Sequence, residues 1–197
     1  MAVATTRRSQ QERSDQTVGS LLGVARDLFG TSGYAATSLD DVARAAGVSK
    51  GALYHHFASK PELFRAVFER EQELLAKKVL TASAKKREHW EAFFTGCRAF
   101  LEGSLDPKVQ RITLLDAPGV LGWQRMRELE APHSFSVMKS AVEKAAADGR
   151  LPHRDPDTVA HIILGAMCEA VAHIATSEKP HRLISSYIDE LRLLVTN

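Results

Sequence analysis

Helical spacing of apolar residues runs through almost the whole chain and limits the fold to helices packed on helices. Apolar side chains recur every three or four residues, first in the segment from Val18 to Phe29. Proline, glycine and helix-capping residues separate each such segment from the next. No alternating run of apolar and polar residues is long enough to predict a strand. The sequence therefore predicts an all-α protein of roughly nine or ten helices of ordinary length.

Length and composition are those of a globular protein. The chain has 197 residues, of which 44% are hydrophobic and 25% charged, so it can bury a core and is not a disordered chain. We expect a polar arm over residues 1–14, a small helical domain over 15–62 and a larger helical domain over 63–197. The two cysteines, Cys97 and Cys168, make neither a disulfide framework nor a cysteine-based zinc site.

The predicted location is the cytoplasm. The first 16 residues are polar and lack the apolar stretch of a secretory signal. The longest apolar segment, residues 159–175, contains His161, Glu169 and His173. It therefore predicts an amphipathic helix and not a membrane span, so we expect no membrane partner.

The net charge of +2 is unevenly distributed along the sequence. Residues 1–60 contain seven basic and five acidic side chains, whereas residues 61–197 contain 19 of each sign. The first segment carries the whole excess, including the arginines of the arm, Arg7, Arg8 and Arg13. This distribution predicts a basic functional region in residues 1–60 and a neutral region in residues 61–197.

Residues 37–56, TSLDDVARAAGVSKGALYHH, predict a helix-turn-helix motif. Ser38 followed three residues later by Asp41 is typical of a helix start, and Gly47 ends that helix. Ser49 is then placed to cap a second short helix. Two short helices joined by a tight turn are one of the motifs that proteins use to bind DNA.

The second helix of this motif has two different faces. At about 100° per residue, Leu53 lies on a packing face. The opposite face carries Lys50, Gly51, Tyr54 and His55. These residues offer hydrogen-bond donors for phosphates or guanine and a bare backbone for close approach. A helical hairpin inside an ordinary bundle, with Tyr54 and His55 merely exposed, is the alternative.

Further phosphate contacts are expected around this helix. The hydroxyls of Thr37 and Ser38, with the amides that follow them, favour an anion, and Lys60 opens the next helix. The candidate DNA-binding residues are Thr37, Ser38, Ser49, Lys50, Gly51, Ala52, Tyr54, His55 and Lys60.

The segment from Leu21 to Val67 resembles the N-terminal DNA-binding domain of the TetR family of transcriptional regulators. The matching residues are Ala25, Leu28, Phe29, Gly33, Tyr34, Thr37, Ser38, Val42, Ala43, Ala46, Gly47, Val48, Ser49, Leu53, Tyr54, Phe57, Ser59, Lys60 and Leu63. The resemblance implies three DNA-binding helices and a larger C-terminal helical domain that dimerises and takes a ligand. One departure is Val18–Ser20, where the family usually has a basic residue; Arg13 or the arm would replace that phosphate contact.

The resemblance implies a homodimer that brings two recognition helices to successive major grooves, about 34–36 Å apart. Apolar stripes over residues 159–174 and 183–194 would pair across a two-fold axis as a four-helix interface. The residues predicted for it are Ile163, Met167, Ala170, Ile174, Ile184, Tyr187, Ile188 and Leu191. The alternative is that both helices pack on the core of their own chain.

The middle of the chain is rich in aromatic residues and is the predicted site of a small-molecule effector. The candidate ligand-binding residues are Trp90, Phe94, Cys97, Phe100, Trp123, Met126, His133, Met138 and Met167. The polar groups that a ligand would need are sought among Arg98, Glu130, His133, His161, Glu169 and His173. The stretch from Ile112 to Trp123 resembles one found in a subset of the family's C-terminal domains. This resemblance does not identify a ligand.

We expect no catalytic residues, no metal site and no cofactor. No histidine pair has metal-ligand spacing, and no nucleophile motif, phosphate loop or catalytic carboxylate pair is present. The predicted function is a repressor that a small apolar or amphipathic molecule releases from a palindromic operator. A helical carrier or enzyme that keeps the motif only as structure, and a nonspecific DNA-compacting protein, are the alternatives.

Overall fold

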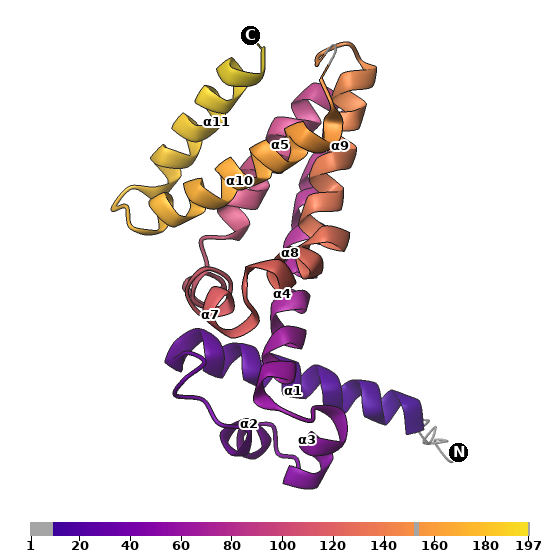
Figure 1. Cartoon of the computed structure of the whole chain (residues 1–197), viewed down its shortest axis with the longest axis vertical. Coiled ribbons are helices and arrows are strands. Elements are labelled where there is room, and N and C mark those ends of the chain that lie inside the picture. The colour runs from indigo at the N-terminus through magenta and orange to yellow at the C-terminus, as the bar shows by residue number, and fades with distance from the viewer. Residues whose placement is uncertain (1–9, 152–153, 197) are drawn as a thin grey trace, which may run out of the picture. The chain divides into compact units, whose positions relative to one another are not determined.

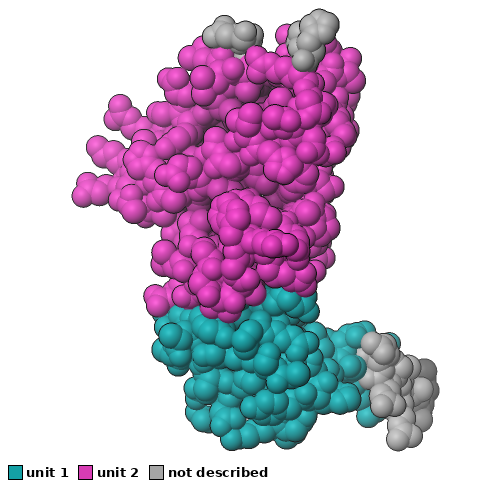
Figure 2. Space-filling view, in the orientation of Figure 1, with its two compact units in different colours: residues 1–67 teal, residues 68–197 magenta. Residues whose placement is uncertain are grey.

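The computed structural model describes residues 10–151 and 154–196, which are helical with no strands (Figure 1). This confirms the predicted all-α class. The chain divides into two compact units, residues 1–67 and 68–197 (Figure 2). The boundary proposed from the sequence, after residue 62, lies a few residues earlier in the same helix, α4 (Lys60–Ser83).

The first unit contains α1 (Gln10–Ser32), α2 (Leu39–Ala45), α3 (Lys50–His56) and the start of α4. Its core consists of Leu21, Ala25, Phe29, Val42, Ala43, Leu53, Phe57, Leu63, Phe64 and Val67. The rings of Phe29 and Phe64 meet edge to face with their centroids 5.2 Å apart. Gly33, with φ of 85°, adopts the left-handed conformation that ends α1.

The start of α1 differs from the predicted arm. The helix begins at Gln10, so residues 10–14 are helical, because Gln, Glu and Arg are good helix formers that can extend an anchored helix into solvent. Arg13 is an exposed residue of this helix. Arg7 and Arg8 lie outside the described residues.

The second unit contains the rest of α4 and the helices that follow it. These are α5 (His89–Gly103), α6 (Pro107–Gln110), the π-helical turn η1 (Arg111–Asp116), α7 (Ala117–Leu121), α8 (Trp123–Glu130), the π-helical turn η2 (Ala131–Phe135), α9 (Ser136–Ala147), α10 (Pro156–Ala175) and α11 (Pro180–Thr196). The predicted interruption near Pro132 is η2, because proline has no N–H for the helical ladder.

Helix α10 lies at the centre of the second unit, where it packs against α5, α9 and α11. One of its faces, which includes Ile163, Leu164, Met167 and Val171, is buried in the core of the unit. By length and composition α10 is apolar enough to cross a membrane, a test that core helices of soluble proteins also pass. Only 39% of its apolar window is buried inside the chain, so much of the helix surface is left uncovered.

Candidate functional site

The predicted helix-turn-helix is formed by α2, the turn at Gly47 and α3. Both helices begin with a serine cap: Ser38 Oγ accepts from the Asp41 amide at 3.1 Å, and Ser49 Oγ accepts from the Ala52 amide at 3.1 Å. Gly47 has φ of 66°, a conformation that suits glycine and lets the chain reverse between the helices. Local capping and one glycine thus fix the motif.

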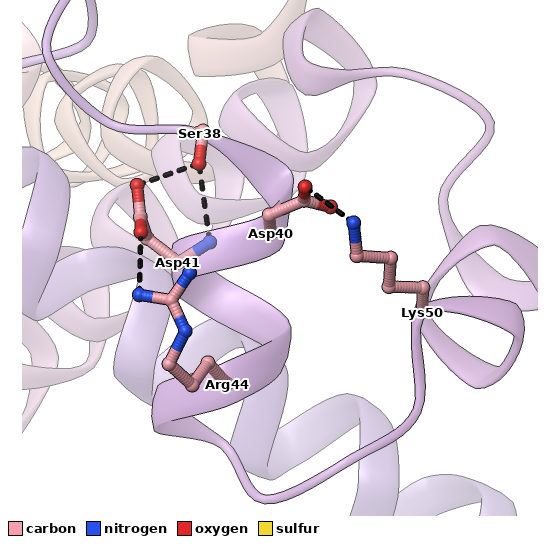
Figure 3. Close-up of polar contacts among 5 residues, drawn as sticks. All are labelled: Ser38, Asp40, Asp41, Arg44 and Lys50. Carbon is pink, nitrogen blue, oxygen red and sulfur yellow. Dashed lines mark hydrogen bonds and ion pairs between the residues drawn. The ribbon is translucent and has the colours of Figure 1, made fainter.

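Polar contacts brace the start of α2 (Figure 3). Ser38 Oγ donates to Asp41 Oδ2 at 2.5 Å, and the Arg44 guanidinium pairs with Asp41 Oδ1 at 3.0 Å. These contacts, the Ser38 hydroxyl first, lower the pKa of Asp41 below its ordinary value. Asp41 is therefore held ionised as part of the helix cap.

The exposed face of α3 is the face that helical spacing predicted. Leu53 is fully buried, whereas Lys50, Gly51, Tyr54 and His55 are exposed. Lys50 Nζ forms an ion pair with Asp40 Oδ2 on α2, with 2.5 Å between the two atoms (Figure 3). Asp40 was missed by sequence reasoning, since it lies ten residues from Lys50 and no local spacing rule joins them.

Thr37 and Lys60 have hydrogen-bond partners within the first unit. Thr37 is buried and its hydroxyl donates to the Gly33 carbonyl at 2.9 Å. Lys60 Nζ donates to the carbonyls of Tyr34 and Thr37 at 2.9 and 3.0 Å and lies 4.2 Å from the centre of the Tyr34 ring. These bonds hold the loop before α2, and the roles of both residues as phosphate contacts stay predictions.

A cavity of about 380 Å³ lies within the second unit. Its apolar lining consists of Leu75, Phe100, Val109, Leu114, Pro118, Trp123, Met126, Leu164, Val171 and Ala172. Its polar lining consists of Glu71, Gln72, Ser104, Thr113, Arg127, Glu130, Ser134, Cys168 and Glu169, with Gly165 completing the wall. An apolar wall with a few polar groups is typical of a small-molecule site.

The polar groups of this cavity form two sets of contacts. Arg127 Nη1 pairs with Glu130 Oε2 at 2.8 Å, and the guanidinium lies 4.2 Å from the centre of the Trp123 ring. Burial raises the pKa of Glu130 above its ordinary value, and the neighbouring Arg127 opposes that shift. Separately, Ser134 Oγ donates to Gln72 Oε1 at 3.0 Å.

Three of the predicted ligand residues, Phe100, Trp123 and Met126, line this cavity. Cys97 and Met138, with Phe100, line a second cavity of about 40 Å³, which is too small for an organic ligand. Trp90, Phe94, His133 and Met167 line neither cavity. Trp90, Phe94 and Met167 are instead core residues. Aromatic spacing alone does not distinguish a cavity wall from a packed core.

Some of the candidate polar ligand contacts line the larger cavity and others do not. Glu130 and Glu169 line the larger cavity, whereas Arg98, His133, His161 and His173 do not. Sequence reasoning missed its other polar members, which are Glu71, Gln72, Ser104, Thr113, Arg127, Ser134 and Cys168. A signal was available for Gln72, a polar residue on the apolar face of a long helix.

Most of the residues predicted for the dimer interface are buried in their own chain. Ile163, Met167, Ala170, Ile174, Ile184 and Ile188 each expose at most 4% of their surface. Tyr187 and Leu191 pack against the same core, and the Tyr187 hydroxyl lies 2.7 Å from Nδ1 of His173. Within one chain these side chains therefore fill its own core, as the alternative stated, and their role in a dimer stays a prediction.

The uncovered face of α10 is a different one. It consists of His161, Ile162, Gly165, Ala166, Glu169, Ala172 and His173, and α11 adds exposed Leu193 and Leu194. Within residues 10–151 and 154–196, no group of three His, Cys, Asp or Glu side chains is placed to hold a metal ion.

Segments of both units match known protein-family domains. Residues 90–197 match the domain described as "Tetracyclin repressor-like, C-terminal domain", and residues 21–67 match "Bacterial regulatory proteins, tetR family". The chain belongs to the TetR family of transcriptional regulators. The α2–turn–α3 motif is thus the helix-turn-helix of a DNA-binding regulator.

Similar proteins match either most of the chain or a part of it. A crystal structure of a TetR-family transcriptional regulator from Pectobacterium atrosepticum has 34% sequence identity and a TM-score of 0.76, and the match covers 95% of both chains. The Transposon Tn10 TetC protein of Escherichia coli is 26% identical over 83% of each sequence. The HTH-type transcriptional regulator CymR of Pseudomonas putida is 48% identical over 63 residues, 32% of this chain and 31% of CymR.

Proposed function

We propose that this TetR-family regulator is a cytoplasmic homodimeric repressor. A small apolar or amphipathic molecule would release it from a palindromic operator. The observation that carries the proposal is the pairing of an exposed, donor-bearing α3 in one unit with an apolar-walled cavity of about 380 Å³ in the other.

The exposed face of α3 is the proposed reading surface. Lys50 would donate to guanine acceptors or phosphate, Tyr54 and His55 would donate to phosphates, and Gly51 would allow close approach. Ser38, Ser49 and Ala52 would contribute through the helix starts that the two serines cap. The family's DNA-binding motif and the exposure of this face support this assignment.

The part of the uncovered face of α10 that does not line the cavity is the proposed dimer interface, together with Leu193 and Leu194 of α11. It consists of His161, Ile162, Ala166 and His173. Ile162 exposes 66% of its surface and Leu194 72%, and exposed apolar side chains that gather on one face favour burial against a partner. A second copy presents the same face, which a two-fold axis makes self-complementary. Ile162→Glu should lower the dimer fraction in light scattering, whereas Glu178→Gln, on the exposed connection before α11, should not.

The ligand response requires a difference in affinity between two states of the protein. A molecule that binds more tightly to the DNA-free state shifts the population toward it, and a coupling of about 1–3 kcal/mol changes affinity roughly 5- to 150-fold. We propose that the effector occupies the larger cavity and acts through α4. Glu71, Gln72 and Leu75, which line the cavity, belong to the same helix that begins in the DNA-binding unit.

The test is DNA binding by a variant that lacks the reading surface. Replacing Lys50 and Tyr54 by alanine should abolish binding to a palindromic fragment near the protein's coding region while the dimer stays intact. If the double variant binds as tightly as the parent, the chain is better described as a carrier or enzyme that keeps the motif as structure.

The same assay separates a repressor from a nonspecific DNA-compacting protein. Phosphate contacts alone weaken steeply as salt is raised, so a compacting protein would show little difference between operator and random DNA at raised salt. The proposed repressor should still bind the operator more tightly, because base contacts are less sensitive to salt.

A further inference from the structure

The side chains that line the larger cavity include more acidic than basic groups. Three carboxylates, those of Glu71, Glu130 and Glu169, line it against one guanidinium, that of Arg127. Glu71 already has an interaction partner. The cation of Arg127 is already neutralised by Glu130, whose carboxylate oxygen lies 2.8 Å away.

The second carboxylate, Glu169, is exposed and has no ion-pair partner among the described residues. A ligand near Glu169 therefore meets a carboxylate that no cationic side chain among the described residues neutralises.

An independent feature of the wall also points to a ligand. Gln72 exposes only 6% of its surface and lines the cavity. Its amide makes one hydrogen bond, to Ser134 Oγ, and its other polar end has no partner among the described residues. This amide end is not among the buried polar atoms that lack a partner, so it is open to the cavity, where an acceptor group of a bound molecule could accept a hydrogen bond from it.

The aromatic walls favour the same class of ligand. Phe100 and Trp123 line the cavity, and most of the Trp123 side chain is exposed. Arg127 already lies against the Trp123 ring, which shows that this ring accepts a cation at 4.2 Å. Aromatic faces attract cations electrostatically and also bury the apolar body of a ligand.

We propose that the effector of this regulator is an amphipathic cation, with an apolar or aromatic body and one protonated amine that pairs with Glu169. This proposal rests on the proposed ligand-responsive function and adds the chemical class of the ligand. An anion would have to take Arg127 from Glu130 and leave a buried carboxylate without its partner, which is strongly unfavourable.

Three probes that share one skeleton test this selection on the full-length protein. Isothermal titration calorimetry would compare 4-phenylbutylamine, 4-phenylbutanol and 4-phenylbutyrate, which are a cation, a neutral molecule and an anion. The amine should bind about two- to fivefold more tightly than the alcohol, and the acid should bind most weakly. In Glu169→Gln the amine should lose most of that advantage while the alcohol binds as before. Glu178→Gln, which removes an exposed carboxylate outside the cavity, should change neither.

Each other outcome overturns the proposal in a recognisable way. If the amine and the alcohol bind equally, the cavity takes a ligand without charge selection, and the proposed function stands. If the acid binds most tightly, Arg127 and not Glu169 sets the class of ligand. If none of the three binds, the cavity is not a ligand site, and the ligand-responsive part of the proposed function fails as well.

Discussion

Replacing Asp40 by asparagine tests whether the ion pair with Lys50 restrains DNA binding. In the free protein Lys50 Nζ is paired with Asp40 across the motif, at 2.5 Å. If Lys50 turns to DNA when the complex forms, this pair must be broken or weakened in both subunits. Asp40→Asn removes that cost and should therefore tighten DNA binding.

The size of the effect follows from the exposure of the pair. The side chains of Lys50 and Asp40 are 66% and 45% exposed, and pairs in such positions contribute about 0.2–1 kcal/mol. Two subunits give roughly 0.4–2 kcal/mol, which corresponds to about 2- to 30-fold tighter binding. For the same reason the free energy of unfolding should fall by no more than about 1 kcal/mol.

The assay is fluorescence anisotropy with a labelled operator fragment at fixed salt. It would compare the parent, Asp40→Asn, Lys50→Ala and the double variant, because the cycle isolates the coupling between the two residues. Asp27→Asn removes the same charge from α1 and controls for net charge. The reasoning is refuted if Asp40→Asn weakens binding, or if it has the same effect when Lys50 is absent.

Three further predictions concern stability and thiol reactivity. Ser49→Ala removes the cap of α3 and should lower the free energy of unfolding by about 1 kcal/mol in urea titrations; an unchanged midpoint would contradict the capping role. Gly103→Ala would place a Cβ 2.7 Å from Cδ1 of Leu75 and should lower the melting temperature, whereas Gly119→Ala, with open space around it, should not. Burial raises the pKa of Cys97 to about 12, so this thiol should resist Ellman's reagent at pH 8 until the protein is unfolded; rapid labelling of Cys97 in the native protein would show that it is not buried.

The sequence predicted what short-range contacts determine. Ser38, Ser49 and Gly47 act within three or four residues of their own position, so capping rules and one glycine sufficed to locate α2, the turn and α3. The partners of Lys60 were not predicted, because its acceptors are the carbonyls of Tyr34 and Thr37, more than 20 residues earlier. No spacing rule relates a lysine at a helix start to a loop so far away in the sequence.

The dimer residues illustrate a second limit. Helix α10 carries apolar residues on two faces, one with Ile163 and Met167 and another with Ile162 and Ala166. Helical spacing identifies both faces as apolar but does not say which one the chain covers by itself. That depends on where α5, α9 and α11 lie, which only the folded chain shows.

The positive charge of the N-terminal region also has a different meaning in the folded protein. Lys50 is paired with Asp40, Arg44 with Asp41, and the Lys60 ammonium is bonded to backbone carbonyls. These three of the seven cations counted in residues 1–60, at the least, are therefore engaged before DNA arrives. Binding by Lys50 or Arg44 must exchange a carboxylate for a phosphate, and such an exchange gains less free energy than the pairing of a free cation. The net charge of this region thus overstates its attraction for DNA in general. Specific binding requires that the contact of Lys50 with the bases be more favourable than its ion pair with Asp40.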